Sequence, residues 1–323
     1  MPRLRVATFN VENLNPNDPP QKLTGLASLI VDNLGAPDML AVEEIQDDTG
    51  PADDGVVNAS ATYAALISAI AAAGGPAYDF RQIDPVNDQD GGQPGGNIRQ
   101  GFLFRTDGGL AFVDRPGGSS TTPTSVQDAG GQPQLSASPG RIDPANPAWS
   151  ASRKPLVAEF TYQGQTLFVI GNHFTSKGGD QPLFGRFQPP ARGWEVQRHQ
   201  QAQVVHDFVD SILAVDASAN VVVLGDLNDF EFSETVEILK GDPQPILTDL
   251  MDTLPADQRY SYVFEGNSQV LDHILVSQHL LAAAAFEPVH VNAEFWDQAS
   301  DHDPSVARVS MAEDRPASVC PGD

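Results

Sequence analysis

The stretch NVVVLGDLND, residues 220–229, decides the fold. Its apolar run, Val221–Leu224, predicts a buried strand that continues into a polar turn. Asp226 and Asn228 follow two residues apart, so both side chains point to the same side if the strand continues. A carboxylate there can take a proton from water while the neighbouring amide holds that water. Taken alone, the motif is equally typical of an Asx-rich turn that closes a buried strand.

Helical and strand patterns alternate on both sides of this stretch. Helical spacing and end signals predict helices at 21–34, 59–73, 194–213 and 233–241. Alternating or continuous apolar residues predict strands at 3–10, 38–45, 78–83, 101–105, 111–113, 156–162, 166–172, 270–276, 289–291 and 305–309. The resulting rhythm of strand, helix and strand in each half predicts an α/β fold, a four-layer α/β/β/α sandwich of two mixed sheets packed face to face with outer helices.

Two stretches, 84–99 and 114–150, are rich in Gly, Pro, Asp and Ser and show no periodicity. We expect long surface loops there. No linker of disordered composition separates the halves of the chain. We therefore expect a single domain over residues 1–312 and a polar C-terminal tail at 313–323.

The composition excludes several classes of protein. The 323 residues include 18 Lys and Arg against 43 Asp and Glu, so the net charge is −25 and the chain as a whole has no basic footprint for phosphate backbones. The hydrophobic fraction of 40% is enough for a large core, and no apolar run approaches the ~20 residues that span a bilayer. One cysteine, Cys320, excludes an internal disulfide framework. The acidity fits either solubility in salt or outside the cell, or the handling of anionic substrates through bound cations.

Five predicted strands end in clustered polar residues. These are Asn10 and Glu12, Glu43 and Glu44, Asn172 and His173, Asp226 and Asn228, and Asp301 and His302. A sandwich core expels such groups unless they meet at one rim, and oxygen and imidazole donors suit a hard divalent cation such as Mg²⁺. Glu44 faces opposite Glu43 on a regular strand, so only one of them can enter the site. We place Glu44 in the site and Glu43 in solvent.

A histidine near the C-terminus has a carboxylate partner elsewhere in the sequence. Asp272 lies between apolar residues in LDHILVS, and a buried carboxylate needs a partner. His302 in SDHDP is the natural candidate, because this pairing sets the imidazole tautomer and favours the charged ring beside a phosphate. His273 is expected to point away. The remaining histidines are expected on element surfaces without a paired carboxylate; they are His199, His206, His279 and His290.

Four cations flank the candidate segments and could contact an anion. They are Arg105, Arg141, Arg153 and Lys177. Any one of them, taken singly, is an ordinary surface salt-bridge partner. Lys177 closely follows His173, which strengthens the functional interpretation of that strand end.

Taken together, these segments resemble the endonuclease/exonuclease/phosphatase superfamily. The matching pieces, in the order of the family, are TFNVENL at 8–14, AVEEIQD at 41–47, GFLFR at 101–105, GNHFTSK at 171–177, LGDLNDF at 224–230, LDHILVS at 271–277 and SDHDP at 300–304. The stretches RYSYVFEGNSQVLDHILVS and SRKPLVAEF look closest to the bacterial extracellular nucleases. Glu43 departs from the Gln of many relatives, and the absence of PAWxDR disfavours the inositol-phosphatase branch.

The resemblance implies a metal-dependent phosphoesterase and assigns a role to each matching residue. Asn10 and Glu44 would hold the metal, with Glu12 and Asp301 as additional or water-mediated ligands. Asp226 would be the general base, Asn228 would steady the water, His302 oriented by Asp272 would bind the phosphoryl oxygen, and His173 would stabilise developing charge or assist the leaving group. Apart from the resemblance, the candidates for contact with substrate are the four flanking cations Lys177, Arg105, Arg141 and Arg153, together with Asn172. The metal would be Mg²⁺, with Mn²⁺ and Ca²⁺ as alternatives.

Three functions compete. The leading one is a divalent-metal-dependent phosphodiester hydrolase, a nuclease that cleaves DNA or also RNA by in-line attack of an Asp-activated water. The alternative is a phosphatase or phosphodiesterase for small-molecule or lipid head-group esters, which the net charge of −25 favours. A non-catalytic calcium- or partner-binding module predicts loss of strand-end groups, whereas all are present.

Partners and localisation follow less directly from the sequence. We expect a monomer without a membrane span. The resemblance and the Asp-rich surface favour secretion, with any signal outside this chain because residues 1–9 lack an apolar signal core. A cytoplasmic origin is the alternative.

Overall fold

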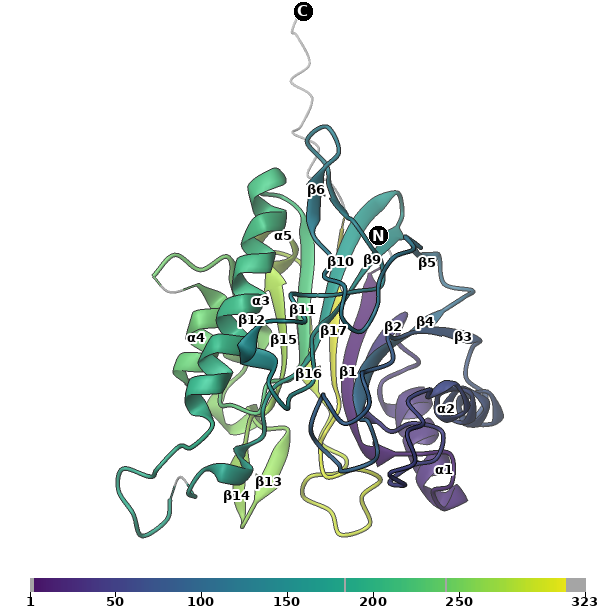
Figure 1. Cartoon of the computed structure of the whole chain (residues 1–323), viewed down its shortest axis with the longest axis vertical. Helices are drawn as coiled ribbons and strands as arrows, with labels where there is room; N and C mark the ends of the chain where they lie inside the picture. The colour runs from purple at the N-terminus through teal and green to yellow at the C-terminus, as the bar shows by residue number, and fades with distance from the viewer. Residues whose placement is uncertain (1–2, 183, 242, 312–323) are drawn as a thin grey trace, which may run out of the picture.

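Two large mixed sheets stand face to face between outer helices in the computed structural model, which describes residues 3–182, 184–241 and 243–311 (Figure 1). The expected tail at 313–323 and Cys320 lie outside the described residues. Within the described part of the chain, no helix is both long enough and apolar enough to cross a membrane.

The first sheet has the strand order β16-β17-β1-β2-β4-β3. Its strands are β1 (Leu4–Leu14), β2 (Met39–Ile45), β3 (Tyr78–Arg81), β4 (Arg99–Arg105), β16 (Ala285–Pro288) and β17 (Ser305–Val309). Only β1 and β2 pair in parallel; the other neighbours are antiparallel. Three helical segments cover its outer face: α1 (Pro20–Ser28), a π-helical turn (Leu29–Asn33) and α2 (Ser60–Ala72).

The second sheet has the order β12-β15-β11-β10-β9-β5, with β8 beside β9. Its strands are β5 (Leu110–Phe112), β8 (Gly140–Arg141), β9 (Leu156–Tyr162), β10 (Gln165–His173), β11 (Asn220–Asp226), β12 (Leu247–Asp249) and β15 (Asp272–Ser277). Here β10 and β11 form the parallel pair. The helices α3 (Glu195–Val215) and α4 (Glu234–Lys240) cover the outer face, opposite α1 and α2 (Figure 1).

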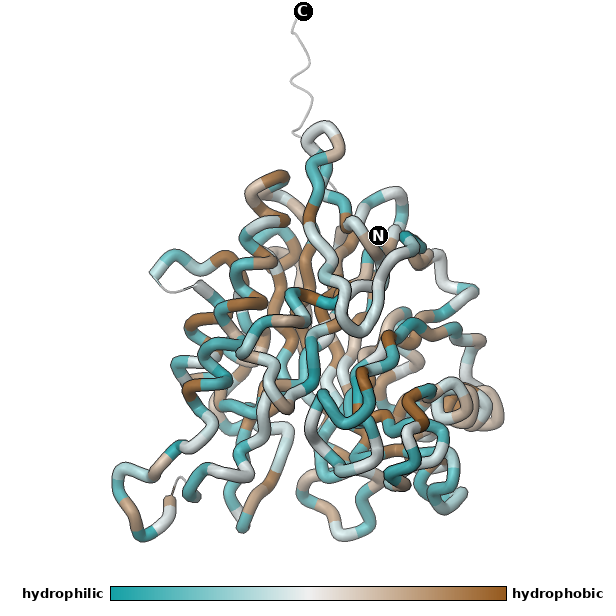
Figure 2. Tube along the Cα trace, viewed as in Figure 1, coloured by the Kyte–Doolittle hydropathy of each residue, from teal (hydrophilic) through white to brown (hydrophobic). Residues whose placement is uncertain are grey.

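Three apolar layers hold the sandwich together. Phe102 and Phe160 meet between the sheets, with ring centroids 6.3 Å apart. Leu66 of α2 belongs to the layer behind the first sheet, and Val205 of α3 to the layer behind the second. Figure 2 shows hydrophobic stretches along the inner strands and hydrophilic residues at many of the connecting turns. The predicted four-layer α/β/β/α sandwich is confirmed.

The ends of several elements match their sequence signals. Ser233 accepts a hydrogen bond from the Val236 amide at the start of α4, and Gly241 ends the helix with a φ of 91°. This left-handed conformation favours glycine. Gly35 likewise follows the π-helical turn with a φ of 66°.

Some predicted boundaries were wrong. The strand expected at 289–291 is instead β16, which ends at Pro288. The carboxylate of Asp303 accepts hydrogen bonds from the amides of Val291, Asn292 and Ala293, so these groups are bonded to a side chain and do not extend the ladder.

Short elements escaped prediction because two to four residues show no clear period. Inside the expected loops lie β6 (Val126–Asp128), β7 (Pro133–Leu135), β8 and a 3₁₀ turn (Pro147–Trp149). Later in the chain lie β12, a β13–β14 hairpin (Tyr262–Phe264 and Asn267–Gln269), 3₁₀ turns at Lys177–Gly179, Leu250–Thr253 and Ala256–Gln258, and α5 (Gln278–Leu281).

Candidate active site

The strand ends named above converge at one rim of the sandwich. Strand pairing places Asn10 beside Glu43 in the first sheet and His173 beside Asp226 in the second. Asp226 is also the pairing partner of Asp272. Because parallel strands end on the same side of their sheet, the two parallel pairs β1–β2 and β10–β11 bring these polar residues together.

Asp226 is the centre of this cluster and is only 2% exposed. Its Oδ2 accepts a hydrogen bond from Asn10 Nδ2 at 3.2 Å and lies 3.6 Å from His173 Nε2 and 3.9 Å from His302 Nε2. Its Oδ1 accepts a hydrogen bond from the Asn228 amide at 2.8 Å. Burial raises the pKa of Asp226 to about 7. A carboxylate with this pKa can exchange a proton near neutral pH.

The expected contact between Asp272 and His302 is present. His302 Nδ1 lies 2.7 Å from Asp272 Oδ2, and both residues are buried. Burial lowers the pKa of His302, but Asp272 and then Asp226 and Asp301 outweigh burial and raise it well above the usual value. Ligand atoms of Asp226, Asp272 and His302 lie within 4.8 Å of one another, as in a metal site. We infer that Asp272 holds His302 and is not a metal ligand, because Asp272 Oδ2 and His302 Nδ1 are hydrogen-bonded to each other.

His173 faces the same carboxylates but has the opposite electrostatic character. Burial lowers its pKa well below the usual value, and the charges of Arg153 and His302 lower it further. Its Nε2 lies 3.9 Å from Glu44 Oε1. His173 is therefore a neutral imidazole beside the charged ring of His302.

Glu44 enters the site through an irregularity of β2. The register of β2 against β1 and β4 shifts just before Ile45, and Glu44 has a φ of 63°. A bulge of this kind re-aims a side chain. Glu44 Oε1 accepts a hydrogen bond from Asn10 Nδ2 at 3.1 Å, and Oε2 accepts one from the Asn13 amide at 3.0 Å.

The placement of Glu43 in solvent was wrong. Its side chain is 0% exposed and points between the sheets, on the same face as Met39 and Ala41. Thr8 Oγ1 donates a hydrogen bond to Glu43 Oε1 at 2.9 Å. Burial, followed by the charge of Asp272, raises the pKa of Glu43 well above the usual value. The bulge explains the error, because it lets both acids face inward.

The donor set at the rim fits a hard divalent cation. Oxygen atoms come from the carboxylates of Glu12, Glu44 and Asp301 and from the amide of Asn10. Burial raises the pKa of Glu12, and Asp301 and Glu44 raise it further through repulsion. A bound cation would relieve this repulsion, so the cluster of acids is suited to hold a metal ion.

Two of the five predicted substrate contacts lie at the site. Arg153 is 5% exposed and donates a hydrogen bond to the Phe174 carbonyl, and among the described residues no carboxylate lies within ion-pair distance of it. Lys177 lines the same region, but its Nζ lies 2.5 Å from Asp229 Oδ1. Arg153 is thus the cation better placed to meet an anion.

The structure does not bring the other three into the site. Arg105 is the last residue of β4 and lies beside the start of β2, whereas Glu44 is near the end of β2. Its guanidinium pairs with Asp107. Arg141 is 3% exposed and pairs with Asp90. The amide of Asn172 donates to the carbonyls of Ile170 and Leu224 and so joins β10 to β11. These three residues were predicted to contact substrate because they lie close in sequence to the site motifs, but their side chains make other contacts in the structure.

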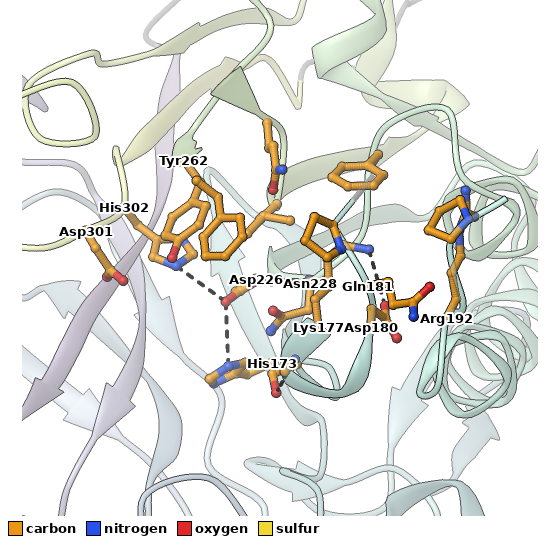
Figure 3. A pocket seen from close by; sticks show the side chains of 18 of the residues that line it. His173, Lys177, Asp180, Gln181, Arg192, Asp226, Asn228, Tyr262, Asp301 and His302 are labelled. Carbon is orange, nitrogen blue, oxygen red and sulfur yellow. Dashed lines mark hydrogen bonds and ion pairs between the residues drawn. The ribbon is translucent and has the colours of Figure 1, made fainter. Parts of the chain in front are cut away.

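Two recesses meet at the reactive groups, and Glu44 and His173 line both. The first holds about 410 Å³ and is also lined by Asp226, Asn228 and His302 (Figure 3). The second holds about 430 Å³ and is lined by polar residues, including Asn13, Gln93, Arg153 and Gln197, and by Ile98 and Trp194. The reactive centre therefore has room for a group on each side.

Sequence reasoning missed several residues that support the site. Ser300 Oγ donates to the Asn10 carbonyl at 2.6 Å and accepts from the His302 amide at 3.2 Å. The ring of Tyr262 lies 4.8 Å from the ring of His302. Ser300 is the first residue of the SDHDP motif, and its place there was a weak signal of a role in the site. Nothing in the sequence pointed to Tyr262, because a tyrosine of this kind has no characteristic spacing from the catalytic motifs.

His273 points away from the reactive groups, as expected. Its Nδ1 lies 2.6 Å from Asp249 Oδ2 and its Nε2 lies 2.9 Å from the Asp229 carbonyl oxygen. His290, expected without a carboxylate partner, instead has its Nδ1 3.2 Å from Asp303 Oδ2. Asp303 follows His302 directly, so the sequence offered a signal for this contact.

Comparison with known proteins agrees with this geometry. Residues 7–302 match the sequence profile of the Endonuclease/Exonuclease/phosphatase family. The chain belongs to this family. Endonuclease/Exonuclease/phosphatase proteins are phosphoester hydrolases and generally use divalent metal ions. No curated protein sequence matches the chain. The predicted closeness to bacterial extracellular nucleases stays a prediction.

Solved structures of other family members share the fold. An endonuclease/exonuclease/phosphatase from Bacteroides vulgatus is 16% identical, with a TM-score of 0.59 over 97% of this chain and 100% of that chain. TDP2 of D. rerio, complexed with single strand DNA product, is 17% identical, with a TM-score of 0.56 over 96% and 99%. The mannosyl-6-phosphatase Bt3783 of Bacteroides thetaiotaomicron is 14% identical, with a TM-score of 0.53 over 95% and 100%.

Proposed function

We propose that this chain is a divalent-metal-dependent phosphodiester hydrolase, a nuclease that acts on DNA or RNA. One observation carries the proposal: Asp226 Oδ2 lies within 3.2–3.9 Å of Asn10, His173 and His302 at the meeting point of two recesses. In this proposal a base, a neutral imidazole and a charged imidazole surround one point where phosphorus can be attacked.

Asp226 acts as the general base in this proposal. The Asn228 amide fixes the carboxylate through Oδ1, which leaves Oδ2 directed at the reactive centre. Asn228 also lines the first recess, where its side-chain oxygen can accept a hydrogen bond from the attacking water. The raised pKa of Asp226 suits proton transfer near neutral pH, where a general base contributes about 10²–10⁴-fold.

The two histidines stabilise charge on the phosphoryl group. His302, held by Asp272, is charged and donates from Nε2 to a phosphoryl oxygen. His173 is neutral and can donate from Nε2 toward the leaving-group oxygen without adding a second positive charge beside His302. Preorganised donors of this kind account for about 10²–10³-fold each in rate.

Asn10, Glu44, Asp301 and Glu12 would hold Mg²⁺, or Mn²⁺ in its place. When bound, the ion would supply Lewis-acid polarisation of the phosphoryl oxygen and would offset the repulsion between an acidic rim and an anionic substrate. Arg153 adds a fixed positive charge in the second recess.

A diester fits this site better than a monoester, because recesses flank the centre on two sides. The complex of D. rerio TDP2 with single strand DNA product supports nucleic acid as the substrate class. A phosphatase for small or lipid head-group esters is the second candidate, favoured by the net charge of −25 and by the likeness to Bt3783.

A substrate panel tests the proposal. Supercoiled plasmid, bis(4-nitrophenyl) phosphate and 4-nitrophenyl phosphate are incubated with the protein in Mg²⁺ and, separately, in EDTA. We expect cleavage of plasmid and diester in Mg²⁺ and none in EDTA. Asp226→Asn is expected to lose at least about 10²–10⁴-fold in turnover, whereas the exposed control Asp257→Asn keeps it. Turnover of the monoester with intact plasmid refutes the nuclease assignment, and full activity of Asp226→Asn refutes the assignment of the base.

A further inference from the structure

The first recess has walls that the proposed reaction does not use. These walls come from residues 176–182 and 190–192 of the loop after β10, from Phe230 in the turn after β11, from the β13–β14 hairpin and from Leu271. The recess holds about 410 Å³, which lies in the ~300–1,000 Å³ range of small-molecule pockets. Figure 3 shows Tyr262 above the reactive groups and Lys177, Gln181 and Arg192 on the far side.

Aromatic rings form much of these walls. Phe230 is 6% exposed and stacks on Phe232, with ring centroids 5.3 Å apart and 22° between the ring planes. Phe264 at the hairpin lines the recess and is 44% exposed. Tyr262 lies against His302 with an angle of 42° between the rings. Three aromatic residues, Phe230, Tyr262 and Phe264, thus line a space that begins at the reactive centre.

The cations in the same walls have acidic partners. Lys177 Nζ lies 2.5 Å from Asp229 Oδ1 and 4.1 Å from the centre of the Phe230 ring. Arg192 Nη1 lies 2.5 Å from Glu195 Oε1. Because carboxylates offset both positive charges, these walls are poorly suited to bind a row of backbone phosphates. They are better suited to a flat group that carries little charge.

The second recess differs in character. Asn13, Gln93 and Gln197 line it together with Arg153, whose guanidinium has no carboxylate within ion-pair distance among the described residues. A polar or anionic group gains hydrogen bonds there. The two sides of the reactive centre therefore select different chemical groups.

We propose that the first recess is a specificity subsite for one planar aromatic group attached to the scissile phosphate, which in a nucleic acid is an unpaired base. This inference rests on the proposed function and narrows its substrate to single-stranded or locally unpaired nucleic acid. Every base has a π face that stacks on aromatic side chains, whatever its sequence. The loop and the hairpin both line the recess, so its walls suit a single base better than a base pair.

Paired oligomers with and without bases test the subsite. The first probe is a labelled single-stranded oligothymidylate, and the second is the same strand built from abasic tetrahydrofuran residues. Each is incubated in Mg²⁺ with the wild type, Phe264→Ala and Trp296→Ala, and kcat/KM is measured. Phe264 is 44% exposed, so its truncation costs little packing; Trp296 is 94% exposed and is a matched aromatic control on another segment.

We expect Phe264→Ala to lower kcat/KM for oligothymidylate about 10-fold, which is about 1.4 kcal/mol, and to leave the abasic strand unaffected. Trp296→Ala should change neither, and pairing with oligodeoxyadenylate should slow cleavage of oligothymidylate. Equal wild-type rates on the two strands, or equal losses on both strands in Phe264→Ala, overturn the subsite while the proposed function stands. Failure of the wild type to cleave either strand overturns the subsite, and if plasmid and bis(4-nitrophenyl) phosphate also stay intact in Mg²⁺, the proposed function is refuted with it.

Discussion

The buried pair of His273 and Asp249 makes a quantitative prediction about unfolding and pH. Both side chains are 0% exposed, and His273 Nδ1 lies 2.6 Å from Asp249 Oδ2. Burial lowers the pKa of His273, but Asp249 outweighs burial and raises it to about 9 from 6.5. A group with a raised folded pKa stabilises the fold fully below its unfolded pKa and loses this contribution as pH rises through the folded value.

The magnitude follows from these two values. A pKa of about 9 in place of 6.5 corresponds to about 3 kcal/mol of unfolding free energy. This contribution is present below about pH 6 and absent above about pH 10. For a domain whose total stability is about 5–15 kcal/mol, the loss is large enough to measure.

Urea unfolding at several pH values measures this contribution. We expect His273→Gln to be destabilised relative to the wild type by about 3 kcal/mol more at about pH 6 than at about pH 10. The exposed control His279→Gln should follow the wild type at every pH. A wild-type–variant difference that does not change with pH refutes the reasoning, because it would mean that His273 titrates alike in the folded and unfolded chain.

Other substitutions test the core and the site. Phe102→Ala leaves a cavity between the sheets and is expected to cost about 3–5 kcal/mol in urea unfolding; a loss below about 1 kcal/mol contradicts the inter-sheet core. Gly225→Ala is expected to cost about 1–3 kcal/mol from backbone strain alone, since Gly225 has a φ of 125° and an added Cβ would lie 2.1 Å from the Asn172 carbonyl oxygen. Asp272→Asn should lower kcat by about 100-fold or more in steady-state assays run where urea unfolding shows the variant to be folded; wild-type turnover argues against its role in holding His302.

The sequence predicted the layers because long strands and helices have strong periods. The strand β11 has 7 residues and the helix α3 has 21, and each is long enough for its pattern to distinguish strand from helix. The elements that failed are three- or four-residue strands such as β12 and β16. Their positions depend on tertiary contacts, such as the Asp303 carboxylate that bonds the amides after β16.

The candidate site was predictable where function depends on a strand end and not where it depends on a local irregularity or a distant loop. Asp226 and His173 lie where the register of β10 and β11 requires. Glu43 points inward by the regular alternation of β2, and Glu44 reaches the site through a bulge, which no spacing rule predicts. The pairing of Arg141 with Asp90 depends on how a long loop folds back, and loop paths are not periodic.

The hydrogen bond between Asp272 and His302 spans the sandwich. Asp272 begins β15 of the second sheet, whereas His302 stands in the connection into β17 of the first. The geometry of the Asp272–His302 hydrogen bond thus depends on how the two sheets pack against each other. Loosening the aromatic interface between them would cost turnover while circular dichroism still recorded intact helices and strands. Hydrolysis is therefore a more sensitive gauge of layer docking than any measure of secondary structure.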